Sequence, residues 1–312
     1  MTKYNCTVHT VEVWTPYVND DAGSHDFCVE VRWKSNGYRV KINPHKLHKV
    51  NGKFQFAYRT AAQIEYDLQM CYELMGGVDC KIKRLDIALD TQRDYMDTEK
   101  IARLIALMLM DDGQNRYLSS DPLTLDLKSL TIRNGEKGST DTKQIEHYNR
   151  LLMPQEHWHG EPVRNRFELR RMRSQIRDTD TVTSIARKWL SDFERTMTEK
   201  RMQEVIQTIS DGLYERWLRY TEMRKRNGKP ISKQERNMFY VCNSDNVFTK
   251  EQLRQLYLLD RKNGMSVSDT AVDNILKLDR YGTAFKLYSY KDVKQEFQAM
   301  TDALRKFAED AE

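Results

Sequence analysis

The sequence lacks the features that mark zinc knuckles, secreted disulfide proteins and membrane proteins. It has five cysteines at irregular spacings and no Cys-x-x-Cys pair, which argues against a zinc site and is typical of free thiols in a reducing cytoplasm. The polar N-terminal residues do not have the pattern of a signal peptide. The longest apolar run, Ile101 to Met110, is interrupted by Arg103 and is too short to span a bilayer. We therefore expect a cytoplasmic protein with no membrane partner.

Internal repeats and low-complexity tracts are also missing, and the composition is that of a globular protein. The 312 residues are 39% hydrophobic and 31% charged, and the net charge of +5 identifies no partner by itself. The distribution of charge is more informative, because six arginines lie between Arg164 and Arg177. A block this dense fits a polyanion-binding surface, although a solvated face with acidic neighbours has the same composition.

Hydrophobic periodicity predicts a mixture of strands and helices. Alternating patterns indicate strands over residues 5–14, 26–33, 38–42, 80–90, 123–127, 130–133, 144–151 and 164–172. Helical spacing indicates one helix ending at Gly76-Gly77 and a second over 99–111, with Asp97 or Thr98 as its N-cap. This order predicts an α+β fold: an antiparallel or mixed sheet with helices packed on one face, followed by a helical C-terminal region. The other sheet face is expected to be open, as in platforms that bind nucleic acid.

The helical character of the chain after about residue 178 predicts its domain organisation. We expect an open-faced sheet domain over 1–178, a helical extension and linker over 179–230, and a helical accessory domain over 231–312. Within the last segment, two short helices separated by Asn263-Gly264 permit a DNA-binding helix-turn-helix. Many helical bundles show the same pattern, so both interpretations stay open.

Two carboxylates share one face of the strand 80–90. Asp86 and Asp90 alternate with Leu85, Ile87 and Leu89, so they point away from the expected core. Carboxylate oxygens suit Mg²⁺ or Mn²⁺. The alternative is that each aspartate forms a salt bridge with an arginine or caps the strand end.

The strand 164–172 places charged groups in the same way. Arg166, Glu168 and Arg170 share one face, while Phe167 and Leu169 point towards the core. Arginines can hold a phosphate with a bidentate fork, and the glutamate can complete a cation site or act as a base. The alternative is a ladder of cross-strand ion pairs, each of which contributes little to stability.

A tyrosine in the strand 144–151 is the candidate nucleophile. Tyr148 shares its strand face with Glu146 and Arg150. A phenol has a pKa near 10 and is a poor nucleophile at neutral pH, but a nearby cation or base promotes its deprotonation. A tyrosine at such a position is also compatible with ordinary amphipathic packing.

The order of these motifs resembles a known family. The motifs are Arg84-Leu85-Asp86-Ile87-Ala88-Leu89-Asp90, Gly135-Glu136-Lys137-Gly138-Ser139, Ile145-Glu146-His147-Tyr148-Asn149-Arg150 and Arg166-Phe167-Glu168-Leu169-Arg170. Together, over about residues 80–173, they resemble the replication initiation factors of plasmids and bacteriophages that start rolling-circle replication. Two positions depart from the family's pattern, since Arg150 replaces a usual lysine and Glu146 a common arginine.

The resemblance implies a metal-dependent tyrosine nickase in a bacterial host. Tyr148 would attack a phosphodiester of single-stranded or hairpin origin DNA, leaving a 5′-phosphotyrosyl link and a free 3′-hydroxyl. Magnesium or manganese would bind to Asp86, Asp90 and Glu168. The DNA would be held by five arginines: Arg150, Arg164, Arg166, Arg170 and Arg171. A host helicase and a homodimer are left open as further partners.

Two alternatives to a nickase use the same basic sheet. One is a non-catalytic DNA-binding protein, such as a phage or plasmid regulator, and the other is an RNA-binding module. The pair His157 and His159 could bind metal, as histidine pairs do in many rolling-circle nickases. However, Pro154 and Pro162 on either side favour a loop with exposed histidines.

Overall fold

A single antiparallel sheet organises the protein. The computed structural model describes residues 4–50, 53–54, 57–110, 116–118, 129–134, 142–150, 164–205, 222–223, 226–228, 258, 270 and 290–309. The eight strands of this sheet run in the order β2-β3-β1-β6-β10-β9-β8-β7, and every neighbouring pair is antiparallel. They are β1 (Asn5–Thr15), β2 (Cys28–Lys34), β3 (Gly37–Ile42), β6 (Lys81–Thr91), β7 (Arg116–Leu118), β8 (Ser129–Asn134), β9 (Lys143–Asn149) and β10 (Asn165–Met172). A separate two-stranded ribbon consists of β4 (Lys49–Val50) and β5 (Lys53–Phe54).

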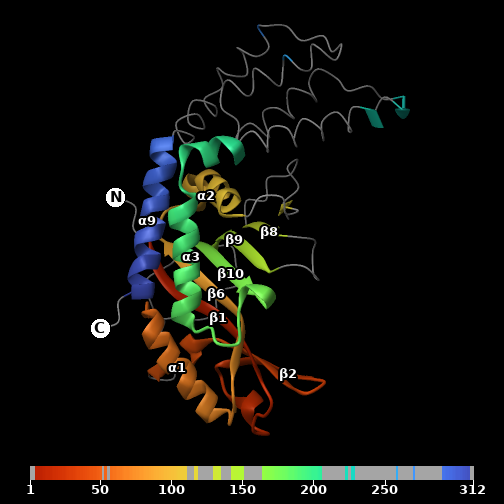
Figure 1. Cartoon of the computed structure of the whole chain (residues 1–312), viewed down its shortest axis with the longest axis vertical. Coiled ribbons are helices and arrows are strands. Elements are labelled where there is room, and N and C mark those ends of the chain that lie inside the picture. Colours follow the sequence, from red (N-terminus) through yellow and green to blue (C-terminus); the bar gives the residue numbers. More distant parts are fainter. Residues whose placement is uncertain are drawn as a thin grey trace.

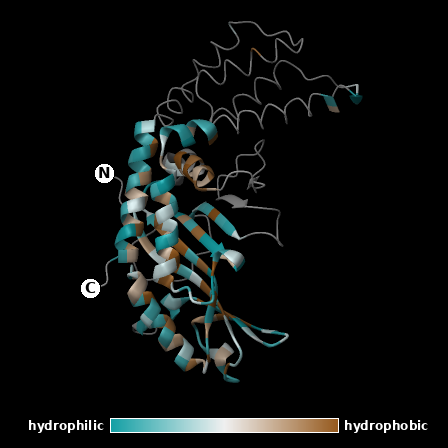
Figure 2. Ribbon diagram, in the orientation of Figure 1, coloured by the Kyte–Doolittle hydropathy of each residue, from teal (hydrophilic) through white to brown (hydrophobic). Residues whose placement is uncertain are grey.

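The helices lie together on one side of the sheet (Figure 1). They are α1 (Ala61–Leu74), α2 (Tyr95–Leu109), α3 (Val182–Thr196) and α9 (Tyr290–Glu309). Helices α3 and α9 contact each other and β6, and α2 contacts β8 and β9. Much of α2 is hydrophobic (Figure 2), as expected for a helix against the sheet. The predicted α+β class, with helices on one face of an antiparallel sheet, is therefore confirmed.

Local sequence signals account for the helix ends. A capping box between Thr60 and Gln63 starts α1, and Gly76 follows its end with a φ of +63°. A side chain at Gly76 would collide with Asn19, whose Oδ1 lies 2.2 Å from the ideal Cβ position. Helix α2 starts earlier than predicted, because Asp94 rather than Asp97 or Thr98 is its N-cap.

The core lies between the helices and the face of the sheet that they cover. Leu89 of β6, Phe167 of β10 and Trp189 of α3 are at most 1% exposed. Phe193 of α3 packs against Phe297 of α9, with 4.8 Å between the ring centroids. Because strand residues alternate between faces, burying this set directs the charged residues between them to the other face.

The last helix returns to the first strand. The hydroxyl of Tyr4 donates to Oε1 of Glu296 at 2.5 Å, and Nη1 of Arg93 donates to Oε2 of Glu296 at 2.7 Å. Although α9 belongs to the segment expected to be an accessory domain, it packs on the sheet. No helix in the described part of the chain is long and apolar enough to cross a membrane.

Some predicted features lie outside the described residues. These are the strand 123–127, the turn 135–139, the histidine pair His157 and His159, and almost all of the helix-turn-helix over 249–276.

Candidate active site on the polar face of the sheet

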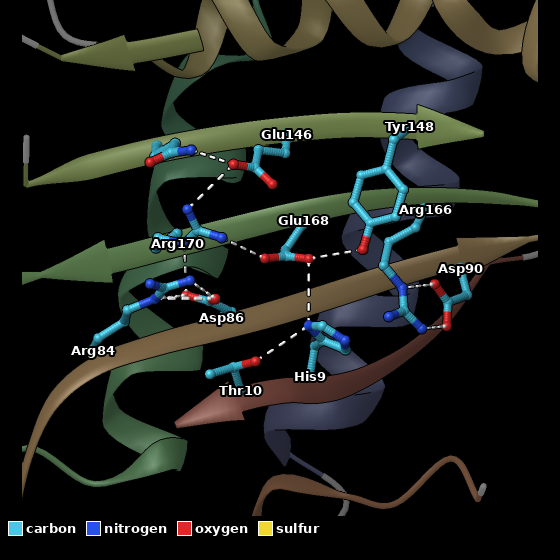
Figure 3. A network of polar contacts seen from close by, with 11 residues as sticks. His9, Thr10, Arg84, Asp86, Asp90, Glu146, Tyr148, Arg166, Glu168 and Arg170 are labelled. Atoms are coloured by element: carbon cyan, nitrogen blue, oxygen red, sulfur yellow. Dashed lines mark hydrogen bonds and ion pairs between the residues drawn. The ribbon is translucent and has the colours of Figure 1, made fainter. Parts of the chain in front are cut away.

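The polar face of the sheet is the face that points away from the helices. Arg166 of β10 lies opposite Tyr148 of β9 and Asp90 of β6, and Arg170 lies opposite Asp86 of β6. Directly paired residues point to the same side of a sheet. The register therefore brings Tyr148, Asp86, Asp90 and Glu168 to one face, as the sequence predicted (Figure 3).

The Tyr148 hydroxyl donates a hydrogen bond to Oε2 of Glu168 at 3.0 Å. Tyr148 is only 8% exposed and Glu168 only 3%. Burial, reinforced by the charge of Glu168, raises the pKa of Tyr148 well above its ordinary value, and Arg166 and Arg150 partly oppose this. The resting site therefore holds a neutral phenol whose proton already points at a carboxylate.

Both aspartates of β6 form ion pairs with arginines. Nε and Nη2 of Arg166 donate to the two carboxylate oxygens of Asp90 at 2.7 and 2.8 Å. Oδ1 of Asp86 accepts from Nε of Arg84 at 2.9 Å and from Nε of Arg170 at 2.8 Å. Burial disfavours the charged form of Arg166, but the charge and hydrogen bonds of Asp90, together with nearby Tyr148 and Glu168, outweigh burial and raise the pKa of Arg166. The salt-bridge alternative considered for these aspartates is thus the arrangement observed.

Arg170 connects the remaining carboxylates of the site. Its Nη2 donates to Glu168 at 2.9 Å and its Nη1 to Glu146 at 3.2 Å. Burial raises the pKa of Glu146, and Arg170 partly opposes this. One guanidinium therefore orients three carboxylates, those of Asp86, Glu146 and Glu168 (Figure 3).

This arrangement of carboxylates does not fit a divalent cation. Asp86, Asp90 and Glu168 each face at least one guanidinium group. Among the described residues, no three histidine, cysteine, aspartate or glutamate side chains are grouped to hold a metal ion. Binding Mg²⁺ or Mn²⁺ here would require the arginines to release these carboxylates.

The five arginines expected to hold DNA are not all on the polar face. Arg171 points towards the helices, where its Nη2 donates to Asp192 at 2.6 Å and its guanidinium lies 4.5 Å from the ring centroid of Trp189. Successive strand residues point to opposite faces, so Arg170 and Arg171 cannot both contact the same DNA. Arg164 is surface-exposed and pairs with Asp94 at 2.6 Å, and Arg150 is half-buried.

The polar face is less open around Tyr148 than the sequence suggested. Asp86 is fully buried, and Arg166 is 2% exposed. Ion pairs between strands let long charged side chains cover one another, which an alternating pattern does not reveal. A short 3₁₀ helix, η2 (Pro44–Lys46), also contacts this face, since Nε2 of His45 lies 3.1 Å from the hydroxyl of Thr7.

Two histidines near the site were not identified from the sequence. A register shift between Val8 and Thr10 interrupts the β1–β6 pairing at His9, and Nδ1 of His9 lies 3.7 Å from Oε2 of Glu168. Burial and the charge of Arg166 lower the pKa of His9 to about 3. The pKa of His45 is also lowered to about 3, by burial and then by Arg166. His9 follows Thr7 by two residues in a predicted strand, and this alternation could have placed both side chains on the same face. Nothing in the local sequence marks His45.

The fold has a distant likeness among solved structures. A solved structure of a rolling circle replication initiator protein from Geobacillus stearothermophilus is 13% identical, with a TM-score of 0.29, over 54% of this chain and 74% of that chain. A scan of family models and a search of curated proteins give no match. A likeness this distant says nothing about what the present chain binds or does.

Proposed function

We propose that this protein is a DNA nicking and joining enzyme that initiates rolling-circle replication, with Tyr148 as its nucleophile. The observation that carries the proposal is the 3.0 Å hydrogen bond from the Tyr148 hydroxyl to Glu168 on a face rich in guanidinium groups. A nucleophile in contact with its base, held by a third group, is the usual arrangement for covalent catalysis. Arg170 supplies the third group by holding Glu168.

The chemistry needs one proton acceptor and one electrophile. As the Tyr148 oxygen attacks the phosphorus, its proton passes to Glu168. A bond forms between the phenolic oxygen and phosphorus, and the bond from phosphorus to the 3′ oxygen breaks. The leaving 3′ oxygen takes a proton from solvent. Rejoining reverses these steps, with the 3′-hydroxyl attacking the phosphotyrosine and Glu168 returning the proton to Tyr148.

Arg166 and Arg170 have different roles in this proposal. Arg166 lies opposite Tyr148 in the register and its positive charge favours the phenolate. Arg170 aligns Glu168 with the phenol. Arg164 and Arg150, which are nearer the surface, are the candidates for contacts to the DNA backbone.

One observation favours a second candidate, a non-catalytic DNA-binding protein. Tyr148 is buried and the charged groups around it are paired, and such networks also occur as purely structural features. The two candidates differ in one product, because only the enzyme forms a covalent bond to DNA.

The Tyr148→Phe variant tests the proposed nucleophile. We expect wild-type protein incubated with 5′- and 3′-labelled single-stranded DNA to form an adduct that survives denaturing electrophoresis. Tyr148→Phe should form none while still binding the DNA, because it lacks only the attacking oxygen. Tyr66→Phe, which makes the same change at a tyrosine that is 69% exposed on α1, is the matched control. An adduct of wild-type yield from Tyr148→Phe would disprove the assignment.

The divalent cation stays a prediction, and no step above depends on it. Excess EDTA should abolish adduct formation and Mn²⁺ should restore it if a cation displaces the arginines when DNA binds. Undiminished adduct formation in EDTA would remove the cation from the proposal and leave Tyr148 and Glu168 in place.

A further inference from the structure

A row of three cations and a tryptophan crosses four strands at the other end of the polar face. Arg32 of β2 lies opposite Arg39 of β3, Arg39 lies opposite Trp14 of β1, and Trp14 lies opposite Lys81 of β6. We call these four residues the basic row. Directly paired side chains share a face, so all four point to the same side of the sheet.

The basic row is on the same face as the candidate active site. Arg84 contacts Asp86 and lies opposite Glu12 in the register, and Glu12 and Trp14 alternate on β1. Nε of Arg39 also lies 3.1 Å from Oε1 of Glu12. At about 3.3 Å per residue, the strand from Asp86 to Lys81 separates the two sites by roughly 15 Å. A single DNA strand can therefore extend from one to the other.

Exposure distinguishes the two arginines of the basic row from Arg166 and Arg170 of the active site. The side chains of Arg32 and Arg39 are 61% and 46% exposed, whereas Arg170 is 12% exposed. All three cations have acidic partners, Glu30 for Arg32, Glu12 for Arg39 and Asp79 for Lys81, but exposed pairs of this kind contribute little and can exchange for a phosphate. The row is thus where the backbone of a long ligand can reach guanidinium groups.

The tryptophan gives the row an aromatic surface. Nζ of Lys81 lies 5.7 Å from the centroid of the Trp14 ring, a cation–π distance. Gly37 begins β3 beside this ring, and a Cβ built there would lie 3.0 Å from the ring and 2.6 Å from the carbonyl oxygen of Thr15. A side chain at position 37 would therefore crowd Trp14. Strand β2 extends away from α3 and α9 in Figure 1.

We propose that the basic row binds single-stranded DNA that flanks the cleaved bond. Cations that follow the backbone, combined with an aromatic ring on which a base can stack, are the usual features of single-strand binding. This inference rests on the proposed function for the identity of the ligand. It adds a binding surface on β1, β2, β3 and β6 that does not include the nucleophile.

The test removes the charges and measures DNA binding separately from chemistry. All proteins carry Tyr148→Phe, and the probe is a labelled single strand of about 20 nucleotides, longer than one typical binding site. Arg32→Ala, Arg39→Ala and Lys81→Ala are combined in one variant. The control combines Arg195→Ala, Lys200→Ala and Arg305→Ala, which removes the same charge from exposed positions outside the row.

The salt dependence of binding decides the outcome. Each lost contact with a single-stranded phosphate should lower the slope of log K against log salt by about 0.7, so the row variant should lose about 2. The control should keep the slope of the protein that carries Tyr148→Phe alone. Equal slopes and affinities for the two triple variants would overturn the basic row as a binding surface. That result would not affect the nucleophile, which the adduct assay tests in protein with Tyr148 intact.

The aromatic contribution has its own variants. Trp14→Ala should weaken binding by roughly 5- to 150-fold, the loss associated with one stacked base, and Trp14→Phe should lose less. Trp33→Ala is the control, because the exposed Trp33 follows Arg32 on β2 but points to the opposite face of the sheet from Arg32 and the rest of the row. If Trp14→Ala and Trp33→Ala, both folded by circular dichroism, bind the strand equally well, no base stacks on Trp14.

Discussion

At the scale of single residues, the hydrogen bond between Tyr148 and Glu168 joins the two reactive groups of the proposed enzyme. The phenol is neutral because burial and the neighbouring carboxylate both raise its pKa. A buried phenol can lose its proton only to a group already in contact with it. Glu168 is that group, and its second oxygen is held by Arg170.

Replacing Glu168 by Gln should separate proton transfer from structure. Glutamine can still accept the hydrogen bond from Tyr148 but cannot take its proton, so single-turnover adduct formation should slow by about 10²- to 10⁴-fold. DNA binding should be retained. Glu146→Gln is the matched control, because Glu146 contacts Arg170, whereas the Tyr148 hydroxyl donates to Glu168. If Glu168→Gln and Glu146→Gln form the adduct equally fast, Glu168 is not the base.

At the scale of elements, the pairing of β6 with β10 determines which charges meet. Eight residue pairs in continuous register place Asp90 opposite Arg166 and Asp86 opposite Arg170. A slip of either strand by one residue would turn the charges of that strand into the hydrophobic core. The ion pairs and the hydrophobic residues of these strands therefore select the same register.

Removing only one partner of the Asp90–Arg166 ion pair should strongly destabilise the folded protein. Asp90→Asn leaves the buried guanidinium of Arg166 without its counter-charge and should lower the free energy of unfolding by about 3–5 kcal/mol in urea titrations. The double variant Asp90→Leu with Arg166→Met should recover most of this loss. Arg164→Ala, which breaks an exposed pair, should cost less than about 1 kcal/mol. Equal costs for the buried and exposed pairs would contradict this account.

The elements themselves were largely predictable from the sequence. Alternation located β1, β6, β9 and β10 to within one or two residues, because each buries one face against helices. The start of α2 was misplaced, since Asp94, Asp97 and Thr98 all have side chains that suit an N-cap. The irregular pairing at His9 was not foreseen, because a bulge depends on the partner strand rather than on local sequence.

At the scale of the whole molecule, the sheet separates a hydrophobic side from a charged one. The helices cover the first, and α9 closes it by returning to β1 (Figure 1). The charged side has a buried part around Tyr148 and an exposed part at the basic row. In our proposal, chemistry takes place in the first part and the DNA backbone is held at the second.

Global stability should depend on pH through His45, which is 2% exposed. Its pKa is lowered to about 3 in the folded protein, so below the unfolded value near 6.5 only the unfolded chain gains the proton. Stability should therefore fall as pH decreases from about 6.5 to about 3, and His45 alone should contribute about 2 kcal/mol of loss between pH 7.5 and pH 5. Urea unfolding at these two pH values measures it. The loss should be about 2 kcal/mol smaller in His45→Gln; an unchanged loss would show that His45 does not carry it.

The sequence by itself determined most of the strands and helices, and that Tyr148, Asp86, Asp90 and Glu168 share one face of the sheet. It could do so because the two-residue period of a strand is a local property. Only the tertiary structure decided which charges neutralise one another, how deeply Tyr148 is buried, that Arg171 packs against Trp189, and that Arg32, Arg39, Trp14 and Lys81 form one row. These features depend on strand order and register, which join residues far apart in the chain, and no local pattern encodes them.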